Sequence, residues 1–189
     1  MTRRLIISLI AIISVVSVAA RELESGYRGF VEWDNAIGKT YYPSMELPGF
    51  KYGGMWFIGG ATSHGYQFND HLYLGAGCMF ACSYPTGDMT IPVFADVRFD
   101  TTIGRLTPFA DLRAGYYYNG GDDGGLYISP TVGYSFRKAG KMSFNLSAGI
   151  TLRGITKEEY GIRDGALILQ SKEHKINTLF TLRFGIEFQ

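Results

Sequence analysis

Three histidines and two cysteines are the first residues of this sequence to consider for catalysis or metal binding. A histidine beside a hydroxyl and a carboxylate can serve acid–base or nucleophilic chemistry, and His174 lies close to Ser171 and Glu173. His64 and His71 flank a short turn, away from that group. Three polar residues in one loop are common by chance, and no Gly-x-Ser-x-Gly, His-Glu-x-x-His or phosphate-binding loop is present. We therefore expect no catalytic site.

The two cysteines do not have the spacing of a disulfide or a metal pair. Cys78 and Cys82 lie in a segment with the pattern of a strand, where a rise of ~3.4 Å per residue separates their Cα atoms by about 13 Å. A disulfide needs less than about 7 Å. No further cysteine is present to complete a zinc site, so we expect packing roles and no metal or cofactor.

The most ordered polar pattern is a repeated Asp-x-Arg pair, made of Asp96, Arg98, Asp111 and Arg113. The chain must turn between the two pairs, and Gly104-Arg105 fits a two-residue type II′ turn, which prefers Gly first. That turn sets Asp96 opposite Arg113 and Arg98 opposite Asp111. A shift by two residues would set Asp96 against Asp111, and like charges directly opposite are destabilising. Turn chemistry and charge pairing thus predict the same register.

Composition indicates that these residues belong to an exported, strand-rich domain. The 189 residues include 25 Gly, and 15% are aromatic while only 19% are charged, against roughly 25% charged in an average protein. The formal net charge of +1 provides no basic surface for nucleic acid. Arg3 and Arg4 precede an uncharged run from Leu5 to Val18, and small residues follow it. Since that run is shorter than the ~20 residues of a membrane span, we predict a signal peptide over residues 1–20.

The rest of the chain alternates apolar and polar residues with a period of two, as half-buried strands do. Met142 to Arg153, for example, has one wholly apolar face and one face of polar residues or Gly. The pattern predicts eight strands: Glu24 to Trp33, Lys51 to Ser63, His71 to Cys82, Thr90 to Thr101, Thr107 to Tyr118, Leu126 to Arg137, Met142 to Arg153 and Phe180 to Phe188. The longest connections are 34–50 and 154–175, and within the second the apolar run Ala166 to Leu169 is expected to extend a hairpin. Pro130 falls inside a strand, where we expect a β-bulge.

These elements predict an all-β fold, an eight-stranded antiparallel up-and-down transmembrane β-barrel over residues 21–189. A soluble, lipocalin-like ligand-binding barrel, with its apolar face inward, is the competing interpretation. Large aromatics at the ends of the apolar rows favour the membrane form: Tyr116, Tyr118, Tyr134 and Phe136. The opposite rows mix both charge signs with Gly, which suits a narrow lumen filled by side chains: Gly75, Gly77, Gly115, Gly133, Gly149 and Gly185.

Further charges fall on the same face of the first and last strands, which must pair to close a barrel: Arg28, Glu32, Arg183 and Glu187. Burying unpaired ions costs several kcal/mol each. We therefore interpret these four residues and the Asp-x-Arg quartet as a structural ion-pair network that fills the lumen. A selectivity ring or a catalytic dyad is the functional alternative.

Four segments resemble small outer-membrane β-barrel proteins of the OmpA/OmpX-like type: Leu72 to Gly77, Phe94 to Arg98, Phe109 to Tyr116 and Phe184 to Phe188. The resemblance covers essentially the whole chain after residue 20. It implies a place in the outer membrane of a Gram-negative bacterium, with outer-membrane lipids and the barrel-assembly machinery as partners. It also gives Phe184 and Phe188 the role of the aromatic assembly signal in the last strand, although Gln189 follows here.

The function expected from these features is non-enzymatic. We expect a structural or surface-interaction role in which outer loops contact an external partner, with a filled lumen and no open pore. Some eight-stranded outer-membrane barrels modify lipid A, so an acyl hydrolase or transferase using His174 and Ser171 is the alternative function.

Overall fold

A computed structural model describes residues 25–43, 50–84, 86–101, 106–119, 124–137, 142–163 and 166–189. The predicted signal peptide and the predicted Gly104-Arg105 turn lie outside the described residues. No helix in the described part of the chain is long and apolar enough to cross a membrane.

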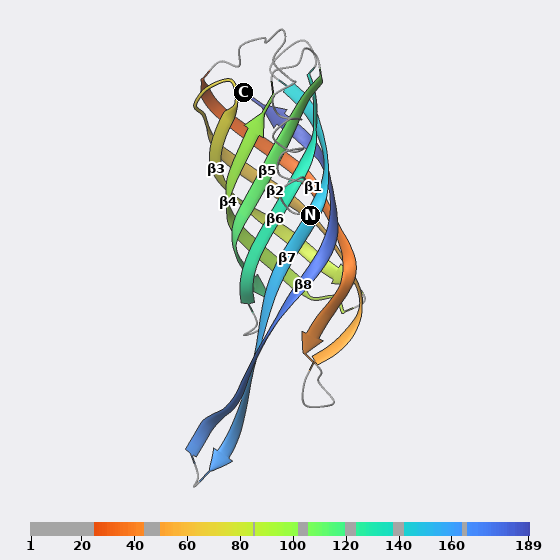
Figure 1. Ribbon diagram of the computed structural model, residues 1–189, viewed down its shortest axis with the longest axis vertical. Helices are drawn as coiled ribbons and strands as arrows, with labels where there is room; N and C mark the ends of the chain where they lie inside the picture. The colour runs from red at the N-terminus through yellow and green to blue at the C-terminus, as the bar shows by residue number, and fades with distance from the viewer. Residues whose placement is uncertain are drawn as a thin grey trace, which may run out of the picture.

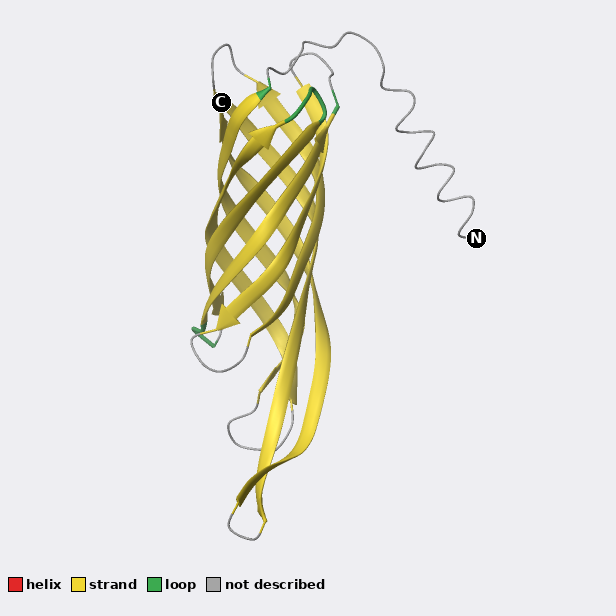
Figure 2. Cartoon of the chain, turned by 90° about the vertical axis from the view of Figure 1, so that its left-hand side faces the viewer, coloured by secondary structure: helices red, strands yellow, loops and turns green. Residues whose placement is uncertain are grey.

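Eight strands form one closed antiparallel barrel (Figures 1 and 2). Each strand pairs with the next, and β1 pairs with β8 to close the sheet. The strands are β1 (Gly26–Pro43), β2 (Phe50–Gln67), β3 (Leu72–Tyr84), β4 (Met89–Asp100), β5 (Leu106–Asn119), β6 (Gly124–Arg137), β7 (Met142–Arg163) and β8 (Ala166–Phe188). The predicted eight-stranded antiparallel barrel is confirmed. We call the end that holds Gly26 and Phe188 the terminal end, and the opposite end the loop end.

Several strands are longer than predicted, and both long connections are mostly strand. β1 continues to Pro43, where its ladder with β2 still pairs Pro43 with Phe50. β7 and β8 pair as far as Arg163 and Ala166, with a register shift between Glu159 and Tyr160. This hairpin projects beyond the barrel at the loop end, as predicted from the apolar start of β8 (Figure 1). Backbone pairing with a neighbour thus extends strands past the point where alternation in the sequence fades.

The register between β4 and β5 is the one predicted. Asp96 pairs with Arg113 and Arg98 pairs with Asp111 across this ladder. The two Asp-x-Arg pairs therefore face the same side of the sheet, at the same height.

The predicted bulge at Pro130 is wrong. β6 keeps one register with β7 on both sides of the proline, from Ile128 opposite Leu152 to Thr131 opposite Gly149. The ladder is only interrupted, because proline has no N–H to donate. The neighbouring Ser129 hydroxyl donates to the Ile150 carbonyl at 3.3 Å instead. A side-chain donor thus replaces the missing backbone donor, and the strand needs no extra residue.

The small barrel leaves little space on its concave inner face. The six glycines singled out in the sequence lie in the inward rows, where they approach the neighbouring strands closely. A Cβ atom at Gly115 would collide with the Val93 carbonyl and the Phe94 Cα atom. Glycine is required there because the neighbouring backbone occupies the space of a side chain.

Candidate functional site

The barrel interior is the candidate functional site, because it holds nearly all charged side chains of the described strands. All eight predicted network residues lie inside it and are buried: Arg28, Glu32, Asp96, Arg98, Asp111, Arg113, Arg183 and Glu187. Asp96 is 1% exposed and Arg98 2% exposed, so both point inward as the membrane interpretation requires.

A first cluster, the terminal-side cluster, lies near the terminal end and consists of Arg28, Arg98, Asp100 and Glu187. Arg28 forms ion pairs with Asp100 and, at 2.9 Å, with Glu187. Arg98 lies 3.0 Å from Asp100 and 3.8 Å from Glu187. Each arginine therefore shares the same two carboxylates, and the two charge signs balance.

Neutral side chains add hydrogen bonds to this cluster. Arg28 donates to the Gln67 amide oxygen at 2.6 Å. Arg98 donates to the Asn145 amide oxygen at 3.2 Å, and the Ser135 hydroxyl donates to Glu187 at 3.0 Å. Buried charges need such partners on their remaining polar atoms to offset desolvation.

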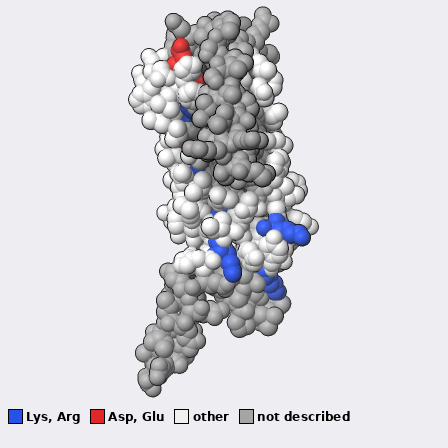
Figure 3. Space-filling view, in the orientation of Figure 1, with Lys and Arg blue, Asp and Glu red and all other residues white. Residues whose placement is uncertain are grey.

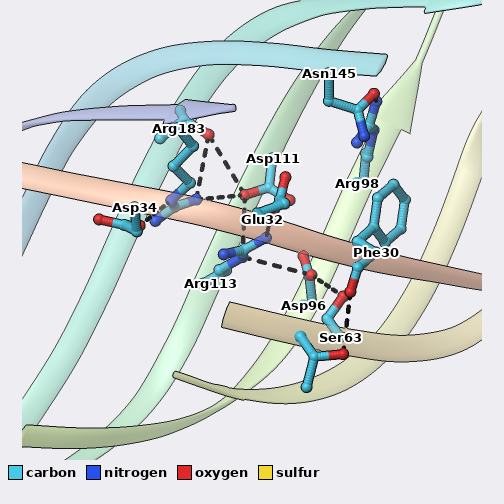
Figure 4. A network of polar contacts seen from close by, with 12 residues as sticks. Phe30, Glu32, Asp34, Ser63, Asp96, Arg98, Asp111, Arg113, Asn145 and Arg183 are labelled. Atoms are coloured by element: carbon cyan, nitrogen blue, oxygen red, sulfur yellow. Dashed lines mark hydrogen bonds and ion pairs between the residues drawn. The ribbon is translucent and has the colours of Figure 1, made fainter. Parts of the chain in front are cut away.

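A second cluster, the central cluster, occupies the middle of the barrel (Figure 4). It joins two arginines with four carboxylates: Arg113, Arg183, Glu32, Asp34, Asp96 and Asp111. Arg113 pairs with Glu32 and lies 3.5 Å from Asp96 and 3.7 Å from Asp111. Arg183 lies 2.5 Å from Asp34 and 3.0 Å from Asp111. Asp111 thus links the two arginines, and the cluster spans four strands.

Hydroxyl groups support the carboxylates and guanidinium groups of the central cluster. The Ser63 hydroxyl donates to Asp96 at 2.6 Å, and the Thr131 hydroxyl lies 3.4 Å from Asp111. Arg183 donates to the hydroxyls of Ser129 and, at 3.3 Å, Tyr127.

The quartet from β4 and β5 does not form two isolated pairs. Asp96 and Arg113 do contact each other, but Arg98 turns to the terminal-side cluster although its Cα atom lies opposite that of Asp111. Arg98 prefers Asp100, two residues along its own strand, because inward side chains of one row are also neighbours.

Three buried charged residues of the interior were not predicted from the sequence: Asp34, Asp100 and Arg153. Asp34 and Arg153 fell at the predicted strand limits. Asp100 continues the inward row of Asp96 and Arg98, a signal that the alternation already contained.

Aromatic rings were expected on the outer surface, but several of them pack inside against the arginines. The Arg98 guanidinium carbon lies 3.4 Å from the ring centroid of Phe109 and 4.8 Å from that of Phe30. Arg113 lies 4.9 Å from the ring centroid of Phe94. These contacts cover guanidinium faces that carboxylates cannot reach and stabilise the buried cations further.

The interior has little free space. Among the described side chains, one cavity of about 10 Å³ lies beside Asp34 and one of about 50 Å³ lies near the loop end. A cavity needs roughly 10–15 Å³ of such volume to hold one water molecule, so the first has room for about one water and the second for a few. Side chains therefore fill the described interior, and no group of three or more His, Cys, Asp or Glu among the described residues could hold a metal ion.

The outward rows of the strands are almost free of charge. Among their described side chains, Lys39 is the single Lys, Arg, Asp or Glu. On the face shown in Figure 3, charged side chains gather toward the two ends, with a largely uncharged surface between them. The outward row of β4 runs from Met89 to Phe99; with ~3.3 Å per residue and a tilt of ~40°, its height is about 25 Å, which matches the apolar band of outer-membrane barrels.

Large aromatics lie on this outer surface near both ends. Tyr116 and Tyr118 are exposed toward the loop end, and Tyr134 and Phe136 are exposed toward the terminal end. Their arrangement as two belts is the one predicted.

The predicted assembly-signal residues occupy the end of β8. Phe184 is exposed on the outer face, and Phe188 packs near the rings of Tyr27 and His64.

The three histidines do not form a common site in the described structure. His174 is exposed and its Nδ1 atom lies 2.7 Å from the Thr156 hydroxyl; the side chains of Ser171 and Glu173 lie outside the described residues. On the outer face, His64 lies between the hydroxyls of Tyr27 at 2.6 Å and Thr62 at 2.8 Å. Thr62 also donates to the Phe30 carbonyl, which ends this chain of hydrogen bonds. His71 contacts the Asp100 carbonyl at 2.9 Å.

Both cysteines are free. Cys78 is exposed on the outer face and Cys82 is partly exposed.

The architecture is similar to that of solved outer-membrane proteins. Neisserial surface protein A (NspA) matches 88% of this chain and 99% of its own, with a TM-score of 0.56 and 13% identity. The outer membrane protein OprG from Pseudomonas aeruginosa matches 89% of this chain and 97% of its own, with a TM-score of 0.56 and 10% identity. The chain has the fold of a small outer-membrane barrel. No protein-family model matches the sequence, and the search of curated proteins finds no significant match.

Proposed function

We propose that the protein is an integral outer-membrane barrel of a Gram-negative bacterium, with a closed interior and a functional surface at its loop end. The observation that carries this proposal is the separation of side chains between the two faces. Charges occupy the inward rows, whereas exposed large apolar residues occupy the outward rows. A water-soluble barrel would leave this continuous apolar surface in contact with water, where such patches cause association.

A closed interior argues against a channel. The terminal-side and central clusters cross the lumen from strand to strand, and the Arg side chains that they contain are at most 2% exposed. An ion passing through would have to displace several charge-assisted hydrogen bonds at once. Charge-assisted hydrogen bonds are stronger than hydrogen bonds between neutral groups, so displacing several of them would be costly.

The β7–β8 hairpin supports a role at the loop end. Its two strands pair beyond the barrel down to Arg163 and Ala166. A rigid barrel that carries a projecting segment is a common arrangement for contact with an external partner. The role is thus structural or interaction-based, with membrane lipids around the barrel and the assembly machinery acting on the end of β8.

Two measurements test the closed membrane barrel. Cell fractionation with heat-dependent migration in detergent gels should place the folded protein in the outer membrane. In planar bilayers the purified protein should add no stepwise conductance, with an open porin as the positive control. Recovery from the soluble fraction, or reproducible conductance steps, would contradict the proposal.

The lipid A-modifying alternative has a separate test. Overexpression of the native protein should leave the mass spectrum of lipid A unchanged. A new lipid A species that disappears in the His174→Ala variant would instead favour the enzyme.

A further inference from the structure

Arg153 differs from the other buried arginines. Arg28, Arg98, Arg113 and Arg183 each lie within ion-pair distance of at least two carboxylates. Arg153 is 6% exposed, yet no carboxylate among the described residues lies within that distance of it. A buried cation without a counterion is costly, so this position requires an explanation.

Two aromatic rings hold the Arg153 guanidinium. Its central carbon lies 4.1 Å from the ring centroid of Phe57 and 4.1 Å from that of Tyr117. Stacking against aromatic rings stabilises the positive charge of the guanidinium group at its two flat faces. It leaves the N–H groups at the edge of the guanidinium for other partners. Asp34 lines the smaller cavity together with Arg153, but its carboxylate already binds Arg183 at 2.5 Å.

The larger cavity, of about 50 Å³, lies beside Arg153 at the loop end of the lumen. Its polar lining includes Thr40 and Thr90, both 2% exposed, and Asn119. The two hydroxyls and the Asn119 amide oxygen are buried and lack a hydrogen-bond partner in the described structure. A cation and two hydroxyl groups therefore face one small space, and the Asn119 amide oxygen beside them accepts a hydrogen bond from neither hydroxyl.

Met55, Phe57 and Ile155 form apolar walls of the cavity, and its lining also includes Tyr41, Ser83, Tyr117 and Asn177. Asp88 is the one carboxylate in the described lining, and it is exposed, so water already solvates its charge. The cavity thus combines one buried positive charge, hydroxyl donors and apolar walls. Its volume suits a carboxylate group with a methyl or ethyl group attached.

We propose that this cavity is a binding site for a short-chain carboxylate such as acetate. The carboxylate pairs with the edge of the Arg153 guanidinium and accepts hydrogen bonds from Thr40 and Thr90. The alkyl part rests against Ile155 and Met55. The bound carboxylate supplies a counterion for Arg153, and the site does not depend on the barrel's having a partner at its loops.

Nuclear magnetic resonance of the refolded, 15N-labelled barrel in detergent tests the proposal. Sodium acetate replaces sodium chloride at constant ionic strength, and the amide resonances of Arg153 and Thr90 are followed. The native protein should show a saturable shift. Arg153→Met should weaken the apparent affinity at least about tenfold, because a charge-assisted pair is lost. Lys39→Met removes one positive charge on the outer face near the same end and should leave the titration unchanged.

A second variant covers the case in which Arg153→Met does not fold. Thr90→Val keeps the shape of the side chain but removes a hydroxyl, and should weaken acetate binding while Arg153 remains. Linear, non-saturating shifts in the native protein would overturn the site. So would equal binding by Arg153→Met, or an unchanged titration in Thr90→Val. Inorganic phosphate that saturates the same resonances as tightly as acetate would overturn the assignment to carboxylates.

Discussion

Replacing Arg113 by methionine should be among the most damaging single changes to this barrel. Arg113 is 2% exposed and faces Glu32, Asp96 and Asp111. Methionine has a similar length but no charge, so the change would leave buried carboxylates without a cation. Removing one partner of a buried ion pair costs about 3–5 kcal/mol. We expect a loss of unfolding free energy in this range.

The contacts of the central cluster indicate which carboxylate carries most of that cost. Asp111 would keep its contact with Arg183 at 3.0 Å, and Asp96 would keep the Ser63 hydroxyl at 2.6 Å. Glu32 has no polar partner other than Arg113 among the described residues. Adding Glu32→Leu to Arg113→Met should therefore recover about 2–3 kcal/mol, a coupling of the size found for residues in one network.

Urea unfolding in detergent micelles or lipid vesicles measures these differences. The fluorescence of Trp33 and Trp56, which are exposed on the outer face, reports unfolding without any added label. The slope of the unfolding free energy against urea concentration should stay constant across the variants. Lys39→Met, an exposed change of the same chemical kind, should shift stability by less than about 0.5 kcal/mol.

Two results would refute the reasoning. A cost below about 1 kcal/mol for Arg113→Met would mean that water solvates the central cluster and the interior is not filled. Absence of recovery in the double variant would mean that Glu32 does not depend on Arg113.

Three further changes probe other parts of the fold. Ser129→Ala should lower the unfolding free energy by about 1–3 kcal/mol, because the Ile150 carbonyl loses its substitute for the missing proline donor and Arg183 loses a hydroxyl acceptor; an unchanged urea midpoint would argue against both roles. Gly115→Val should abolish the heat-modifiable folded form, whereas Ala114→Val, on the outward face next to it, should fold normally. Tyr27→Phe should cost about 1 kcal/mol in vesicles by removing the hydrogen bond to one nitrogen of His64, and equal stability of this variant and the native protein would contradict that hydrogen bond.

The sequence predicted the barrel because alternation is a property of each strand by itself. A period of two fixes which residues of a strand share a face. An even number of such strands can close into a barrel in only a few ways. The pairing of Asp96 with Arg113 followed from the type of turn and from the repulsion between like charges on paired strands, and both depend only on residues close in the sequence. These predictions needed no knowledge of distant contacts.

Contacts between distant strands decided what the sequence did not predict. Arg98 lies opposite Asp111 in the ladder, yet its partners are Asp100 and Glu187, the second of which comes from β8. Which carboxylate an arginine reaches across a lumen depends on strand tilt and on the side chains between them. The alternation of apolar and polar residues in the sequence gives neither the strand tilt nor the identity of the side chains in between.

The limits of the strands were also set by their neighbours. β1 continues past Trp33 to Pro43, although Gly and polar residues weaken its pattern, because β2 offers a continuous backbone ladder. Asp34 therefore becomes an inward strand residue and not part of a loop. Pro130 avoids a bulge for a similar reason, since the Ser129 hydroxyl substitutes for its missing N–H.

Quenching of tryptophan fluorescence by brominated lipids tests the membrane orientation of the barrel most directly. Trp33 is 44% exposed near the middle of the outward row of β1, and Trp56 is 45% exposed on β2 toward the loop end. With ~3.3 Å per residue and a tilt of ~40°, Trp56 should lie about 10 Å nearer to the membrane surface. In single-tryptophan variants refolded into vesicles, bromines near the acyl-chain ends should quench Trp33 most strongly, and bromines near the headgroups should quench Trp56. Efficient quenching of both residues by acrylamide in water, with no effect of brominated lipid, would contradict a lipid-facing outer surface.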